Sequence, residues 1–252
     1  MTAIELRDIS IGYGSRVLLG KANLSFGQGE FCAVIGRNGT GKSTLLRTMA
    51  GLARPLAGEV LIEGEPLKGM THTEVASRIS FVSTEEVRVG NLRVYDVVGM
   101  GRAPYTNWIG TLSAQDRAVV GNALALVGME DFAGKSIETL SDGERQRVMI
   151  ARSLAQDTPV ILLDEPTAFL DLPNRYEISL LLKSLAADHG KGVIVSTHDL
   201  NIVLDLCDRI VLLDEGGALC GTPAEMVDSG LIQNIFRGTS LYYDRGKGVV
   251  KK

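Results

Sequence analysis

A glycine-rich segment after the first strongly apolar run is the feature that most constrains the fold. The run Phe31–Ile35 contains no charged or hydroxyl residue and predicts a strand buried on both faces. The next eight residues, Gly36–Ser43, read GRNGTGKS and fit the pattern G-x-x-x-x-G-K-[ST]. The stretch Lys42–Ala50 is predicted to be helical. A strand, this loop and a helix in that order predict a phosphate-binding P-loop in an α/β domain.

The residue types of the loop suit a nucleoside triphosphate. Glycines let backbone N–H groups curve around phosphate oxygens without Cβ clashes, and the helix start adds partial positive charge. We expect Lys42 to reach the β- and γ-phosphates of ATP and the Ser43 hydroxyl to ligate Mg²⁺. The alternative is a glycine-rich turn that only caps a helix. The predicted nucleotide-binding residues are Gly36, Arg37, Asn38, Gly39, Thr40, Gly41, Lys42, Ser43 and Thr44.

Two adjacent carboxylates end a second apolar run. Val160–Leu163 predicts a buried strand, and Asp164 and Glu165 follow it directly. At the carboxyl edge of a parallel sheet they would lie beside the P-loop, where ligands bind. Asp164 can then help to hold Mg²⁺, and Glu165 can polarise the attacking water as a general base. The alternative is a strand that ends in acids at an ordinary turn.

A capping box begins another predicted helix. In Ser141–Gln146, Ser141 suits the N-cap and Glu144 suits the third helical position. Gly143 in the first turn is costly unless something approaches the backbone closely. A helix start with a serine and a bare glycine is a second anion site, and two such elements in one chain suggest that the second serves another molecule. The alternative is a capping box alone.

The order of predicted elements gives the fold class: an α/β P-loop NTPase core with an antiparallel β subdomain and an inserted helical subdomain. The expected domains are 1–90 and 156–221 for the two halves of the core, 91–155 for the helical part and 222–252 for the tail. Further buried strands are expected at Val193–Val195 and Ile210–Leu213, and short antiparallel strands at Ile4–Ser10, Val17–Leu19, Ala22–Phe26 and Glu59–Ile62. Further helices are expected at Val94–Met100, Ala114–Val127, Gly143–Ala155, Asn174–Asp188, Leu200–Leu206, Pro223–Val227 and Leu231–Phe236, with a frayed end at Gly246–Lys252.

Composition excludes several classes of protein. The 252 residues carry a net charge of −4, which argues against a nucleic-acid partner. Three cysteines without a CxxC pair indicate neither a disulfide framework nor a zinc site, and Cys32 is expected to be a buried apolar residue in a reducing setting. We see no signal peptide, and no apolar run approaches the roughly 18–20 residues that cross a bilayer.

Together the motifs resemble those of ABC-type ATPases over roughly residues 4–221. The segment Leu140–Gln146 is similar to the LSGGQ signature of that family. The other matching motifs, in the family's order and spacing, are the P-loop, Asp164–Thr167, the D-loop Ala168–Asp171 and the lone His198 after a predicted strand.

The resemblance implies roles for further residues. Ser141 and Gly143 would contact the γ-phosphate of ATP held by a second copy of the chain. Asp171 would cross the dimer interface, and His198 would contact the γ-phosphate as a third catalytic residue beside Glu165 and Lys42. Tyr13 resembles the aromatic residue that stacks on adenine, although it could instead be a turn tyrosine packed on the sheet.

The sequence departs from the family pattern at three places. Asp142 and Glu144 stand where the signature has glycine and glutamine, and we expect activity to survive because Glu144 serves the capping box. The glutamine that senses Mg²⁺ is absent after the strand Ile79–Val82. Thr84 takes its place as a candidate metal residue, with Glu85 as the alternative. Water bridging or Glu85 would have to compensate for the shorter threonine.

One segment places the chain within a branch of the family. Leu92–Tyr105 is similar to the TVxDVVxxGRxPY stretch of subunits that serve iron-siderophore, haem and vitamin B12 importers. The resemblance implies integral membrane permease subunits as partners, a substrate-binding protein indirectly, and a peripheral place on the cytoplasmic face of the inner membrane. Trp108 could line the groove that receives the permease, or belong to the core. The alternatives are an exporter subunit or a soluble ABC ATPase without a transport role.

Overall fold

A central parallel sheet organises the molecule, and this agrees with the predicted fold class. The structure is a computed structural model that describes residues 1–83 and 91–252. In these residues the central sheet has six strands in the order β10-β9-β3-β8-β7-β6, and only β10 runs antiparallel to its neighbour. The strands are β3 (Phe31–Gly36), β6 (Ile79–Val82), β7 (Val160–Asp164), β8 (Gly192–Ser196), β9 (Arg209–Asp214) and β10 (Gly217–Gly221).

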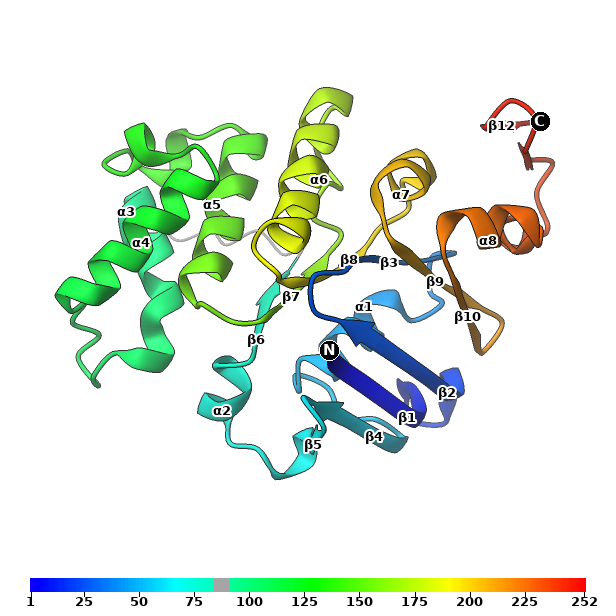
Figure 1. The fold of residues 1–252 in the computed structure, drawn as a ribbon, viewed down its shortest axis with the longest axis horizontal. Helices are drawn as coiled ribbons and strands as arrows, with labels where there is room; N and C mark the ends of the chain where they lie inside the picture. The colour runs from blue at the N-terminus through cyan, green and yellow to red at the C-terminus, as the bar shows by residue number, and fades with distance from the viewer. Residues whose placement is uncertain (84–90) are drawn as a thin grey trace.

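A second, antiparallel sheet in the order β2-β1-β4-β5 lies beside the first (Figure 1). The expected short strands here were wrong, because Val17–Leu19 and Ala22–Phe26 belong to one strand. A register shift between the β1 and β2 pairings absorbs Lys21, whose φ is 47°, so the ladder continues past the irregularity. The strands are β1 (Thr2–Tyr13), β2 (Arg16–Gly27), β4 (Ala57–Ile62) and β5 (Glu65–Pro66).

The predicted helices begin and end within about two residues of their expected bounds, although Leu231–Phe236 is a 3₁₀ turn and the short helix His72–Ala76 was not predicted. Helices α3, α4 and α5 gather at one end of the molecule, away from β1 and β2 (Figure 1). The α-helices are α1 (Lys42–Met49), α2 (His72–Ala76), α3 (Val94–Gly99), α4 (Ala114–Leu126), α5 (Asp142–Ala155), α6 (Leu172–Ala187), α7 (Leu200–Leu206) and α8 (Pro223–Asp228). The 3₁₀ turns are η1 (Leu67–Gly69), η2 (Met100–Tyr105), η3 (Glu130–Phe132), η4 (Ile137–Thr139) and η5 (Leu231–Phe236). No helix in the described ranges is both long and apolar enough to cross a bilayer.

The central sheet separates two apolar cores. Alternate residues of β3 point to opposite faces, so Phe31 and Ile35 join the core under α3–α7, whereas Cys32 and Val34 join the core under α1 and the antiparallel sheet. This explains why the central strands read as unbroken apolar runs. Cys32 is buried as expected, and burial raises the pKa of its thiol well above the usual value. The exact boundaries between the expected domains stay a prediction.

Two expectations at the surface were wrong. The tail is not frayed, because β12 (Val249–Lys251) pairs with β11 (Tyr242–Asp244) in an antiparallel hairpin. The Asp244 carboxylate closes its turn by accepting hydrogen bonds from the backbone N–H groups of Gly246 (3.0 Å) and Lys247 (3.2 Å). The alternative that Trp108 belongs to the apolar core is also wrong, because 94% of this residue is exposed.

The burial of β7 makes a stability prediction. Leu163→Ala should lower the free energy of unfolding by about 2–5 kcal/mol, because Leu163 is fully buried and its loss leaves a cavity. Leu180→Ala on α6 is the matched control. Leu180 is half exposed, so its loss should change stability by no more than about 0.5 kcal/mol. Urea unfolding followed by circular dichroism measures both, and equal midpoints for the two variants would contradict the prediction.

Candidate active site

The P-loop joins β3 to α1, and its backbone requires glycine at two positions in particular. Gly41 is the N-cap of α1 with φ 104°, a conformation that L-residues rarely adopt. At Gly36 a Cβ atom would lie 2.6 Å from the backbone oxygen of Leu213 on β9. The loop therefore curves tightly over the carboxyl edge of the sheet, with the N-terminus of α1 directed into the turn.

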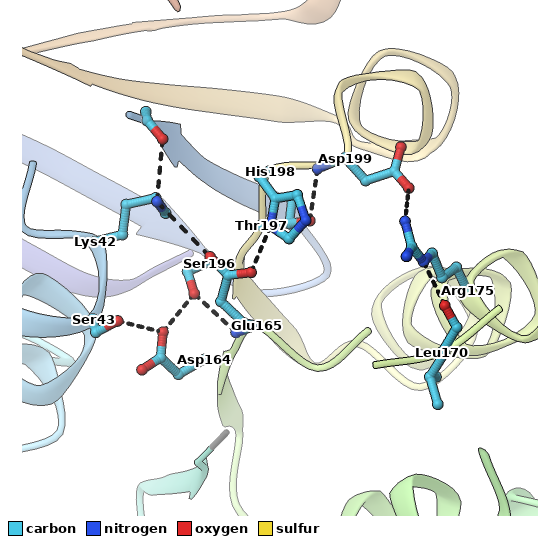
Figure 2. Close-up of polar contacts among 11 residues, drawn as sticks. Lys42, Ser43, Asp164, Glu165, Leu170, Arg175, Ser196, Thr197, His198 and Asp199 are labelled. Atoms are coloured by element: carbon cyan, nitrogen blue, oxygen red, sulfur yellow. Dashed lines mark hydrogen bonds and ion pairs between the residues drawn. The ribbon is translucent and has the colours of Figure 1, made fainter. Parts of the chain in front are cut away.

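Three charged or titratable side chains meet above this edge (Figure 2). Lys42 is buried, and its Nζ donates to the backbone oxygen of Gly36 at 3.1 Å and lies 3.8 Å from Oε1 of Glu165. The other carboxylate oxygen of Glu165, Oε2, is 2.7 Å from Nδ1 of His198. The structure thus brings together the three residues that the sequence nominated as catalytic, with Glu165 between the two nitrogen groups.

A second cluster lies beneath them and includes a residue that the sequence analysis missed. The hydroxyls of Ser43 and Ser196 both donate to Oδ1 of Asp164, at 2.9 Å and 2.6 Å. The backbone N–H of Glu165 donates to the hydroxyl and the carbonyl of Ser196, at 2.9 Å and 3.1 Å. These bonds hold Glu165 at φ 49°, which is unusual for a residue other than glycine. The only signal in the sequence was the position of Ser196 at the end of a buried strand.

Tyr13 lies at the edge of the same loop. Its hydroxyl shares a 2.8 Å hydrogen bond with the hydroxyl of Thr44, and 65% of the residue is exposed. The bond holds the tyrosine beside the P-loop and leaves its ring open to a ligand. Stacking of this ring on adenine stays a prediction.

The signature segment forms the expected capping box at the start of α5. The backbone N–H and hydroxyl of Ser141 each donate to Oε2 of Glu144 at 2.8 Å, and the Glu144 N–H donates back to the hydroxyl at 3.3 Å. The Ser141 N–H, and then its hydroxyl, hold the pKa of Glu144 below its usual value. Glu144 therefore supports the cap as a carboxylate at neutral pH.

Gly143 has a neighbour that the sequence did not reveal. A Cβ at this position would lie 2.9 Å from the side-chain oxygen of Asn174 on α6. The side-chain amide of Asn174 donates to Oδ1 of Asp171 at 2.7 Å, and its backbone N–H donates to the same oxygen at 3.1 Å. Asp171 is thus the N-cap of α6, and Asn174, which bonds to it, lies against the first turn of the signature helix.

Arg175 is a further residue that the motifs did not single out. Its Nε donates to the backbone oxygen of Leu170 at 2.7 Å, and its Nη1 lies 3.6 Å from Asp199 (Figure 2). Arg175 therefore ties the D-loop to the segment that carries His198.

The structure does not bring all the predicted site residues together at the P-loop. Within the described part of the chain, no hydrogen bond or ion pair that we observe joins Ser141 or Gly143 to the P-loop cluster. Thr84 and its alternative Glu85 fall outside the described residues.

Comparison with known proteins identifies the family of this chain. Residues 19–168 match the sequence profile described as ABC transporter. The chain belongs to the ABC transporter family. Among curated relatives, the achromobactin transport ATP-binding protein of Dickeya dadantii is 39% identical over 94% of this chain and 88% of its own length. The petrobactin import ATP-binding protein FpuD of Bacillus anthracis is 36% identical over 98% of this chain and 94% of its own.

Solved ABC structures share the fold. A structure described as an inward-facing metal-chelate type ABC transporter superposes with a TM-score of 0.82 at 29% identity, over 93% of this chain and 88% of that one. The dimeric structure of MJ0796, a bacterial ABC transporter cassette, superposes with a TM-score of 0.75 at 31% identity, over 87% of this chain and 98% of that one. The chain is therefore an ATP-binding ABC-type ATPase that acts in transport, and cassettes of this family dimerise.

The contacts of Ser196 make a prediction about this ABC ATPase. Ser196→Ala removes a hydrogen bond to Asp164 and one to the backbone of Glu165, so turnover at saturating ATP should fall about tenfold. ATP affinity should change little, because the P-loop is left intact. Ser184→Ala on α6, which loses only a bond to the Leu181 carbonyl, is the matched control. Phosphate release assays would refute the role of Ser196 if both variants turned over like the unmodified chain.

Proposed function

We propose that this chain is the ATP-hydrolysing subunit of an importer for an iron chelate, haem or vitamin B12. The observation that carries hydrolysis is the position of Glu165 between Lys42 and His198 at the edge of the sheet. The import of a metal chelate is supported by the relatives that act on achromobactin and petrobactin, and by the likeness to a metal-chelate type transporter. An exporter or a soluble non-transport ATPase is the alternative that these likenesses disfavour.

In this proposal, different residues of the site bind the nucleotide and act in its hydrolysis. The backbone of residues 36–44 and the ammonium of Lys42 bind phosphate oxygens, and the ring of Tyr13 packs on the base. Glu165 accepts a proton from the attacking water, and His198 holds the Glu165 carboxylate in place and faces the terminal phosphate.

The hydroxyl of Ser43 and the carboxylate of Asp164 are the pair that fits Mg²⁺. Their oxygens already share a hydrogen bond, and both are the hard donors that Mg²⁺ prefers. The described residues contain no group of three or more His, Cys, Asp or Glu side chains that could hold a metal alone. This fits an ion that takes one or two protein ligands and completes its shell with phosphates and water. When bound, Mg²⁺ neutralises charge on the phosphates.

A second copy of the chain would complete each site. Ser141 and Gly143 lie on α5 and not at the P-loop of their own chain, so their anion-binding helix start is free to face a partner's ATP. Phe169 and Leu172 beside Asp171 are 78% and 63% exposed. Apolar side chains at this position suit burial in a dimer. Closing on ATP and opening after hydrolysis would then do the mechanical work.

The segment after α3 suits a membrane partner. Met100, Tyr105, Trp108 and Ile109 are exposed by 47%, 43%, 94% and 67%, and they form what we call the loop patch. Such a group of large apolar residues is typical of an interaction site. We assign the loop patch to the integral permease, and we propose that the chain works on the cytoplasmic face of the membrane. A substrate-binding protein would act on the permease from the other side, and no nucleic acid is involved.

Hydrolysis is tested at Glu165. Glu165→Gln should reduce turnover by at least about a hundredfold, leave ATP binding intact and trap an ATP-bound dimer, because the amide cannot accept the proton. Glu130→Gln, at an exposed position far from the P-loop, is the matched control. Turnover of the Glu165 variant at the unmodified rate would show that another group is the base.

The importer assignment is tested through the partner. Coexpression with a candidate permease from the same organism should yield a membrane complex that takes up a radiolabelled ferric chelate or cobalamin in the presence of ATP. Trp108→Asp should weaken the complex because it places a charge in the loop patch. Recovery of the chain on ribosomes or DNA, with no membrane complex, would refute the assignment.

A further inference from the structure

Two side chains of η2 hold the C-terminal end of α5. Arg102 is buried; its Nε donates to Oδ1 of Asp116 at 2.8 Å, and its Nη1 donates to the backbone oxygen of Ala155 at 2.9 Å. The hydroxyl of Tyr105 donates to the backbone oxygen of Gln156 at 3.0 Å, and the Arg102 guanidinium lies 4.1 Å from the Tyr105 ring centre. Both carbonyls thus receive donors from the same short segment.

The physics of helix ends makes this contact favourable. The last carbonyls of a helix have no partner within it and carry partial negative charge, so a cation there is stabilising. The hydrogen bonds from Ser113, and then the bond from Arg102, lower the pKa of Asp116 to about 2. Asp116 is therefore ionised at any pH at which the protein works, and Arg102 keeps a charged partner.

The contact is also direct along the backbone. A Cβ at Gly101 would lie 2.2 Å from the backbone oxygen of Arg152, so only glycine allows η2 to rest on the last turn of α5. Because packed interiors compress little, a displacement of η2 should also displace the last turn of α5.

The same end of α5 is tied to the core on its other side. The side-chain amide of Gln156 donates to the carbonyls of Ala76 at 2.6 Å and Ile79 at 3.0 Å, and the hydroxyls of Ser153 and Ser80 are 2.6 Å apart. This end can act as a pivot. A helix of 14 residues is about 21 Å long, so a rotation about the pivot moves Ser141, at the far end, the most.

We infer that Arg102 and Tyr105 are positioning residues: they link the loop patch to the pivot end of α5 and so set where Ser141 and Gly143 meet the partner's ATP. The inference rests on the proposed function, since it needs a dimer that closes on ATP. It assigns control of dimer closure to two residues of η2, which lie outside the P-loop and the signature segment.

The test separates ATP binding from dimer closure. In a Glu165→Gln background, Arg102→Lys should raise the dissociation constant of the ATP-bound dimer about tenfold, measured by analytical ultracentrifugation. ATP affinity of the monomer should stay within about twofold. Lysine keeps the charge but, as a single point donor, cannot hold the fork geometry that serves Asp116 and the Ala155 carbonyl together.

Two further variants complete the design. Arg117→Lys is the matched control, because Arg117 lies on α4 and donates to the Leu112 carbonyl at 2.8 Å, not to α5. This control should leave the dissociation constant of the ATP-bound dimer and the ATP affinity of the monomer unchanged. Tyr105→Phe removes only the bond to the Gln156 carbonyl and should weaken the dimer about threefold. It decides the question if Arg102→Lys does not fold.

Two results would overturn the inference. One is an unchanged dimer constant in the folded variants. The other is a parallel loss of ATP affinity, dimerisation and melting temperature in both Arg102→Lys and Tyr105→Phe, which would make the two residues structural. If the Glu165→Gln parent itself fails to dimerise with ATP, the proposed function fails first, and that result is seen before any η2 variant is made.

Discussion

The pairing of β7 with β8 is the constraint on which the site depends. It sets Asp164 directly opposite Ser196, so a carboxylate and a hydroxyl meet at the point where two buried strands end together. From there Ser196 holds the backbone of Glu165 in a left-handed conformation, and β3 delivers the P-loop on the other side of β8. Parallel strands make this convergence possible, because their carboxyl ends reach the same edge of the sheet. The apolar packing that buries these strands thus fixes the positions of Asp164 and Glu165 at this edge.

The charged groups at this edge have partners without ATP, and the same groups suit the hydrolysis that we propose. Lys42 is buried, and a buried cation is costly unless it is paired. The Gly36 carbonyl and the Glu165 carboxylate supply its partners in the structure. In the proposed function, phosphate oxygens of ATP compete with Glu165 for the same ammonium. In the proposed function, the carboxylate that the lysine releases accepts a proton while His198 holds it in place.

The sequence predicted the parts whose chemistry is local. The P-loop, the two carboxylates after β7 and the capping box at Ser141 each need only a short run of residues, and each lies where the run implied. The roles of Ser196, Arg175 and Asn174 were not predicted, because only the fold brings them beside Asp164, Asp199 and Gly143, respectively. The continuous β2 and the tail hairpin were missed for a related reason: cross-strand pairing can carry a strand through Lys21 or order a polar tail, and local propensity does not contain it. Thr84 and Glu85 lie beyond the described residues and stay predictions.

Helix α5 has one end that the sequence predicts and one end whose contacts only the fold reveals. Its first turn is readable in the sequence as a cap, and Glu144 fits that cap although the family pattern has glutamine there. Its last turn carries no motif of its own, yet Arg102 and Tyr105 satisfy carbonyls that a helix end leaves open. A residue that binds both an ion-pair partner and a helix end constrains two elements at once. The apolar loop patch belongs to the same segment, so the surface that we assign to the permease and the helix that we assign to a second ATP site are joined by the bonds of Arg102 and Tyr105.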